Sequence, residues 1–230
     1  MRQKQMGFTL VEIAIVLVII GLLLGGVLKG QELINSAKVK NFANDFRNIP
    51  LFIYGYQDKY KSLPGDHATA STIITGATNA TTPTTSGGTA CASSICRGNG
   101  VIDGVWTSTT TTDETFLFWQ HVRLAGLAAG PTSTADANYI PKNADGGAIG
   151  IESGAAATGG AYISGLTPTY LVCSTGILGK FAKQLDTTLD DGDTAAGSLR
   201  VVAMNHTRTN AALATTAVVD STSYIVCMGL

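Results

Sequence analysis

The hydrophobic pattern of the chain begins with an apolar run close to the N-terminus. Apart from Thr9 and Glu12, residues 8–28 are all apolar or glycine. A helix of this length spans about 30 Å, which is the hydrocarbon thickness of a bilayer. No small-residue cleavage site of a secretory signal peptide follows Leu28 before the charged run that begins at Lys29, so we expect the helix to be retained. Residues 8–28 are therefore predicted to form a transmembrane helix.

A second pattern follows in residues 30–61, where apolar and polar positions alternate with helical spacing. Its apolar side chains recur at steps of three and four and so share one helix face: Phe42, Phe46, Ile49, Ile53, Tyr56 and Tyr60. We expect this face to carry the globular part of the protein. The turn residues in 62–66, Ser-Leu-Pro-Gly-Asp, predict the end of the helix.

The remainder of the chain shows shorter periodic segments separated by turn residues. A second helix is predicted over residues 113–129, and a short amphipathic helix over 176–185. Strands are predicted at residues 147–152, 161–164, 169–174, 198–204 and 223–228. The expected fold class is α+β: a long N-terminal helix packed on an antiparallel β-sheet, with variable loops and short helices.

Glu12 is the one ionisable residue inside the apolar run. A carboxylate at such a position costs about 2.5–3.5 kcal/mol on insertion scales, so it needs a partner or a function. Two interpretations stay open. Glu12 either extends its side chain to the nearby membrane interface, or it meets the terminal amine that cleavage after Gly7 would create on Phe8 of a neighbouring copy.

The residues around Glu12 also carry a resemblance. Gly7-Phe-Thr-Leu-Val-Glu12, preceded by the basic residues Arg2 and Lys4 and followed by the apolar helix, resembles the class III signal of type IV prepilins and type II secretion pseudopilins. The resemblance implies that a prepilin peptidase cuts after Gly7 and methylates Phe8, and that Glu12 sets the register of subunits in a filament.

On this basis the chain divides into four parts. Residues 1–7 would be a cleaved leader, 8–29 a transmembrane and filament-core helix, 30–61 an amphipathic stalk helix, and 62–230 a globular pilin head. Because the leader is basic, the positive-inside rule leaves it in the cytoplasm and sends the head across the membrane. The resemblance implies a precursor in the inner membrane of a bacterium and a filament in the periplasm or at the cell surface.

The implied function is that of a structural subunit of a type IV pilus-like filament. Its partners would be other copies of itself and related pilins, the prepilin peptidase, an inner-membrane assembly platform, and membrane lipid before assembly. Two alternatives remain: a pseudopilin of a type II secretion system, or a minor pilin whose head binds a surface or DNA. Gene neighbourhood would distinguish a pseudopilin from a pilus subunit. Copy number in purified filaments would distinguish a minor pilin from the main structural subunit.

Charge and motifs argue against other classes of function. Without the leader the chain has 13 Lys and Arg against 16 Asp and Glu, which does not favour a nucleic-acid surface. The three histidines, His67, His121 and His206, lie in different segments without patterned Ser, Cys or carboxylate neighbours. The sequence also lacks phosphate-binding glycine, HExxH and GxSxG motifs, so we predict no enzymatic activity.

Four cysteines lie beyond the membrane segment, at positions 91, 96, 173 and 227. An even number in an exported domain favours two disulfides, although three pairings are possible. Cys91–Cys96 with Cys173–Cys227 is topologically the simplest pairing, because the first closes a short loop and the second joins two predicted strands. A zinc site formed by these cysteines is disfavoured, since no second close pair or neighbouring histidine completes it.

An acidic segment, Asp186-Thr-Thr-Leu-Asp-Asp-Gly-Asp193, lies between a predicted helix and a predicted strand. Carboxylates in a glycine-containing turn can collect Ca²⁺, and we expect Asp190, Asp191 and Asp193 among the ligands. The spacing is not that of an EF-hand, and the alternative is a solvated acidic turn. The Leu-Asp-Asp-Gly run is similar to loops of some pilin-like proteins, and a calcium site in such a loop is a property of major pseudopilins. Ca²⁺ is the one cofactor suggested.

Overall fold

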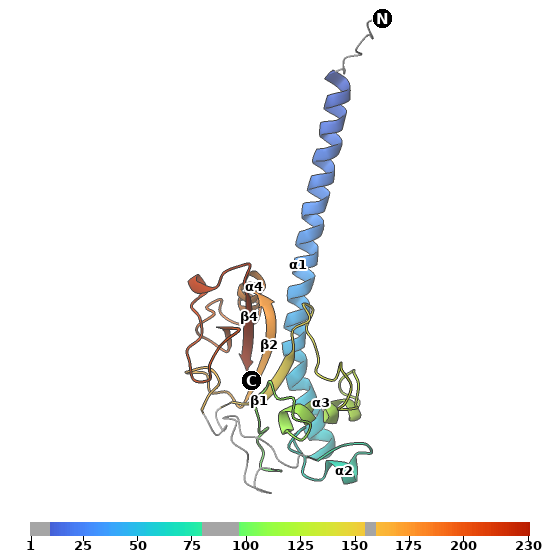
Figure 1. Ribbon diagram of the computed structural model, residues 1–230, viewed down its shortest axis with the longest axis vertical. Coiled ribbons are helices and arrows are strands. Elements are labelled where there is room, and N and C mark those ends of the chain that lie inside the picture. Colours follow the sequence, from blue (N-terminus) through green and yellow to red (C-terminus); the bar gives the residue numbers. More distant parts are fainter. Residues whose placement is uncertain (1–9, 80–96, 155–159) are drawn as a thin grey trace, which may run out of the picture. The chain divides into compact units, whose positions relative to one another are not determined.

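A computed structural model describes residues 10–79, 97–154 and 160–230 of the protein (Figure 1). Its longest element is helix α1, Leu10–Tyr60, which continues through Pro50. The chain forms two compact units, the first ending at Lys40 and the second beginning at Asn41. The boundary falls inside α1, and each unit is described by itself.

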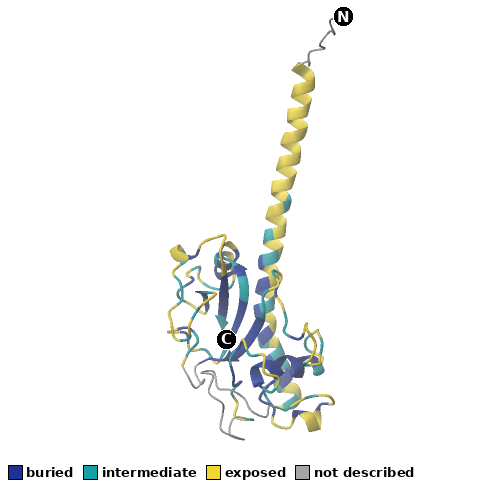
Figure 2. Cartoon of the chain, viewed as in Figure 1, coloured by how far each residue is buried: buried dark blue, intermediate teal, exposed yellow. Residues whose placement is uncertain are grey.

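In the first unit the described residues belong to α1, and their large apolar side chains from Leu10 to Ile34 are exposed (Figure 2). The exposed fraction ranges from 46% at Ile20 to 91% at Leu10. Within the described part of the chain, α1 is the one helix that is long and apolar enough to cross a membrane. A helix that is apolar all round needs lipid or other helices to cover it.

The second unit is built on a four-stranded antiparallel sheet of order β1-β2-β4-β3 (Figure 1). The strands are β1 Ile149–Ser153, β2 Tyr170–Leu178, β3 Leu199–Ala203 and β4 Ser223–Gly229. Four of the five expected strands are thus found close to their predicted positions. The strand expected at 161–164 is wrong, because those residues form bends and turns between Gly160 and Gly165, both at positive φ. Ile163 is nevertheless buried, so an apolar residue is needed in this segment although it is not a strand.

Both faces of the sheet are covered. Against one face pack α4, Gly179–Leu189, and the second half of α1, whose Phe42 ring lies 6.1 Å from that of Phe181. The predicted α1 face is buried, with Phe42, Phe46, Ile49, Ile53 and Tyr56 at most 2% exposed. The opposite face carries a cluster of Trp106, Ile163, Leu166, Leu171, Cys173, Val202, Ile225 and Cys227. The predicted α+β class, a long helix on an antiparallel sheet, is confirmed.

Three short α-helices and a 3₁₀ turn complete the described part of the second unit. Helix α3, Glu114–Leu124, begins where predicted but ends early, because the chain turns at Gly126 with φ of +77°. Helix α4 begins later than predicted because β2 continues to Leu178. The others are α2, Ala70–Ile73, and a 3₁₀ turn, η2, at Thr215–Ala217.

Candidate functional site

The N-terminal candidate residues fall at the edge of the described chain. Gly7 and Phe8, the residues of the expected cleavage site, lie outside the described residues. Glu12 lies in the first turn of α1 and is exposed among apolar neighbours. An acidic side chain is favourable at this end of a helix, because the helix dipole places partial positive charge there. The surrounding surface can pack in lipid or against other apolar helices.

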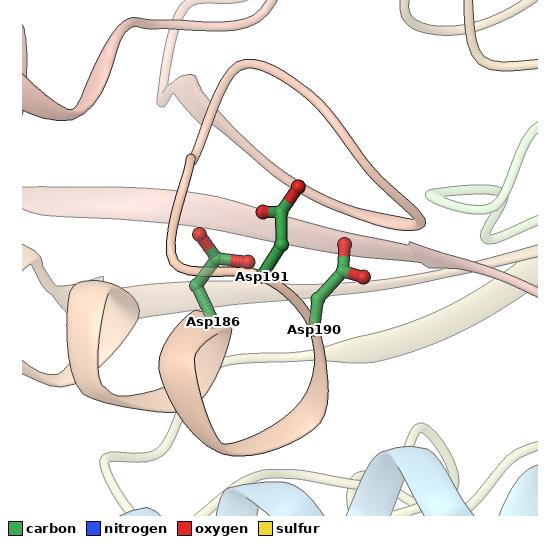
Figure 3. A group of neighbouring side chains, drawn as sticks. All are labelled: Asp186, Asp190 and Asp191. Carbon is green, nitrogen blue, oxygen red and sulfur yellow. The ribbon is translucent and has the colours of Figure 1, made fainter.

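A second candidate lies where α4 ends, and it is a group of three aspartates (Figure 3). Asp186 belongs to the last turn of α4, Asp190 is its C-terminal cap, and Asp191 follows directly. Each offers one carboxylate oxygen, and these oxygens all lie within 4.8 Å of one another. Helical spacing explains the first pair, since residues four apart share a helix face.

Asp186 is the unusual member of this group. Its side chain is fully buried, and within the described chain neither of its carboxylate oxygens has a hydrogen-bond partner. Burial first, and then the negative charges of Asp190, Asp191 and Asp193, raise its pKa to about 7. An uncompensated buried carboxylate is costly, and a bound cation would remove that cost.

The other acidic side chains of the loop have backbone partners. Asp190 Oδ2 accepts a hydrogen bond of 2.8 Å from the Leu199 amide, and Asp191 Oδ1 accepts one of 2.9 Å from the Asp193 amide. Asp193 itself accepts from the Ala195 amide at 3.1 Å and is not part of the group of three. The structure therefore brings together two of the three expected calcium ligands and replaces the third with Asp186.

The sequence carries a signal for the burial of Asp186. Besides Gly179 at its start, the buried positions of α4 are Phe181, Ala182, Leu185 and Asp186, which form one helical stripe. An aspartate on the apolar stripe of a short amphipathic helix is a candidate ligand, because burial without a partner is costly there.

Comparison with protein families identifies the N-terminal segment. Residues 2–28 match the family model of the prokaryotic N-terminal methylation motif. The chain carries this methylation motif. It is the class III signal of type IV pilins and pseudopilins, so the resemblance found in the sequence is confirmed. No curated protein and no solved structure matches the chain.

The methylation motif includes Gly7, Phe8 and Glu12 within its matched range and ends at Leu28. It therefore describes the leader and the apolar half of α1, and it does not extend to the sheet or to the aspartates. The roles of the individual residues in processing and assembly remain predictions.

The cysteines fall into a described and an undescribed pair. Cys91 and Cys96 lie outside the described residues. Cys173 of β2 and Cys227 of β4 stand opposite each other in the sheet register and are joined by a disulfide, with Cα atoms 4.1 Å apart. Both sulfurs lie within the buried cluster on the face of the sheet that α4 does not cover.

Proposed function

We propose that this chain is a structural subunit of a type IV pilus-like filament, made as a membrane precursor and assembled through α1. The methylation motif carries the proposal, because it is found on precursors that are processed in this way. Prepilin peptidase would cut after Gly7 and methylate Phe8. The exposed apolar surface of α1 supports the proposal, since it suits lipid before assembly and other copies of the helix afterwards.

The proposed location and partners follow from the same helix. The precursor would lie in the inner membrane of a bacterium with its head on the extracytoplasmic side. Related pilins and an inner-membrane assembly platform would be further partners. The alternatives of a type II secretion pseudopilin and of a minor pilin remain, and neither gains support from a particular residue of the head. An enzymatic role is not proposed.

Processing is tested by the N-terminus of the mature protein. Mass spectrometry of membrane or filament material should find chains that begin at methylated Phe8. An intact Met1, or an N-terminus beyond Leu28, would contradict the proposal.

Assembly is tested through Glu12. The Glu12→Ala variant should insert normally, because the substitution removes the cost of a carboxylate in the membrane, but its filament yield should collapse. Glu32→Ala is the matched control, since Glu32 lies on the same helix outside the motif and its only described contact is a 2.7 Å exposed ion pair with Lys29. Normal filaments from Glu12→Ala would show that Glu12 only reaches the interface.

We propose in addition that the acidic loop binds Ca²⁺ through Asp186, Asp190 and Asp191, with Asp193 ordering the loop. The support is the buried Asp186 carboxylate, which lacks a partner among the described residues while two acids lie beside it. Binding to the folded state alone would stabilise it by about 2.7 kcal/mol at a hundredfold excess of Ca²⁺ over its Kd.

Thermal melts at pH 8 test this proposal. With chelator, Asp186→Asn should melt above the wild type, because the pKa of Asp186 is raised from 3.8 to about 7 and the resulting loss of stability, which builds up between these two pH values, is complete at pH 8. With Ca²⁺ the wild type should gain stability and the variant should not. Asp58→Asn, at an exposed acid of α1, is the control and should behave as the wild type. If Ca²⁺ shifts the melting temperature of all three proteins equally, the loop is only an acidic turn and not a Ca²⁺ site.

A further inference from the structure

The sheet face that carries the disulfide also bears a pocket of about 310 Å³. Trp106 and Ile225, two of its lining residues, belong to the same buried cluster as Cys173 and Cys227. The rest of the wall comes from Val105, Thr107, Tyr162, Thr175, Met204, His206 and Arg208. Five separate segments of the chain therefore meet around this pocket.

The buried carboxylate of Glu152 holds two of the residues that line the pocket, Trp106 and Arg208. Glu152 of β1 is fully buried, and its two oxygens accept hydrogen bonds of 2.9 Å from one terminal nitrogen of Arg208. Its Oε2 also accepts a 3.0 Å bond from the Trp106 amide. Replacing a buried ion pair by apolar residues is often neutral or stabilising, so stability alone explains this pair poorly. What the pair does is to hold Trp106 and Arg208 in defined positions.

Tyr162, another lining residue, is also held by several contacts. The Arg208 guanidinium lies 5.4 Å from the centre of the Tyr162 ring, and the His206 ring packs edge-on against the same tyrosine at 4.9 Å. Both His206 Nε2 and the Thr209 amide donate to the Tyr162 carbonyl, at 3.0 and 3.1 Å. These contacts use His206 Nε2 as a donor, while Nδ1 takes no part in them.

Backbone strain marks the same segment. Thr209 has φ of 70°, in the left-handed region that β-branched residues rarely adopt. Such a conformation costs about 1–3 kcal/mol and concentrates at binding sites, where the surrounding structure enforces it. The buried ion pair therefore borders the pocket, and the strained Thr209 directly follows Arg208 of the pocket wall.

We propose that this pocket binds a neutral saccharide. Glu152 cancels the charge of Arg208, so the wall favours neither a free anion nor a free cation. The half-buried Tyr162 ring and the Met204 side chain give the wall an apolar part that suits the CH groups of a sugar, while His206, Thr107 and Thr175 offer polar groups to its hydroxyls. The volume lies at the lower end of ligand pockets and fits one or two sugar rings. The proposal is independent of filament assembly.

The test uses the full chain, purified in lauryldimethylamine oxide because this detergent has no sugar headgroup. Glucose, galactose, N-acetylglucosamine and maltose are titrated by calorimetry and by ligand-observed NMR, with indole and inorganic phosphate as probes of other ligand classes. At least one sugar should bind saturably, and indole and phosphate should not.

Two matched variants locate the binding. Met204→Trp fills the mouth of the pocket from a residue 51% exposed, and Val219→Trp places the same side chain at a site 54% exposed outside the pocket. The first should weaken sugar binding about tenfold or more, equivalent to 1.4 kcal/mol, and the second should leave it unchanged. Unchanged melting temperatures show that both fold. Absence of saturable binding by all four sugars, binding that Met204→Trp leaves intact, or binding of indole or phosphate in place of sugar would overturn the proposal.

Discussion

At the scale of single residues, His121 shows how burial sets chemistry that the sequence does not reveal. The sequence shows His121 only as one of three histidines without patterned neighbours, yet in α3 its side chain is fully buried. Its Nδ1 accepts a 2.9 Å hydrogen bond from the Gly65 amide, and its Nε2 donates to the Thr78 carbonyl at 2.9 Å. This pairing requires the neutral ring, and burial lowers its pKa to about 4.

The consequence is a contribution to stability that acid removes. Because the folded-state pKa of His121 lies below its ordinary value of 6.5, this contribution is present above pH 6.5 and is lost as pH falls towards 4, by up to about 3 kcal/mol. His121→Gln should be less stable at pH 7.5 but should lose less stability than the wild type on acidification to pH 5. Denaturant unfolding over this pH range measures both effects.

The control for His121→Gln is Val219→Ala, at an exposed residue that carries no ionisable group, and it should keep the acid dependence of the wild type. Buried acids such as Asp66 and Glu114 have raised pKa values and act in the opposite sense. The neighbouring His67, whose pKa burial also lowers, acts in the same sense, so the difference between variants reports His121 together with its coupling to His67. A His121→Gln protein with the wild-type pH dependence would refute the assignment.

The residues that the sequence did identify share one property. Gly7, Phe8 and Glu12 are neighbours in sequence, so a local motif is sufficient to find them. Glu152 and His121 become unusual only through burial against distant segments. No pattern in the neighbouring sequence states that these two polar residues will lose their water, and this is why the sequence missed them.

At the scale of elements, the periodic spacing of apolar side chains predicted the helices and strands better than local turn signals predicted where they end. The apolar face of α1 and four strands were found because their side chains repeat with helical or alternating spacing. The errors lie where apolar residues are buried without regular structure, as at 161–164, or where a strand runs directly into a helix, as at Leu178 and Gly179. Tertiary contacts decide both cases.

The pairing of β2 with β4 leads to a prediction about Cys173 and Cys227. These residues are 54 positions apart, and for a loop of that length the chain-entropy estimate of stabilisation is about 4 kcal/mol, which is an upper figure. The double variant Cys173→Ser, Cys227→Ser should lower the denaturation midpoint and remain folded. Peptide mapping without reductant should recover the two cysteines as one linked peptide, and a link from either to Cys91 or Cys96 would contradict the pairing.

At the scale of the whole molecule, the chain combines two compact units with different surfaces. The first presents apolar side chains that require lipid or other helices, whereas the second buries its apolar side chains within its own core. The second unit also holds the disulfide, the aspartates and the saccharide pocket. We therefore expect it to fold without the apolar half of α1, and the membrane and assembly functions to depend on that half alone.

A chain beginning at Ser36 tests this division. It removes the exposed apolar side chains from Leu10 to Ile34 and keeps the α1 residues that are buried from Val39 onward. Without surface that needs lipid, it should be a water-soluble monomer with cooperative unfolding, an intact Cys173–Cys227 link and no incorporation into filaments. Light scattering, circular dichroism melts and filament co-purification measure these properties, with the full chain in detergent as the comparison. A truncated chain that aggregates or melts without cooperativity would show that the apolar half of α1 is needed to complete the core.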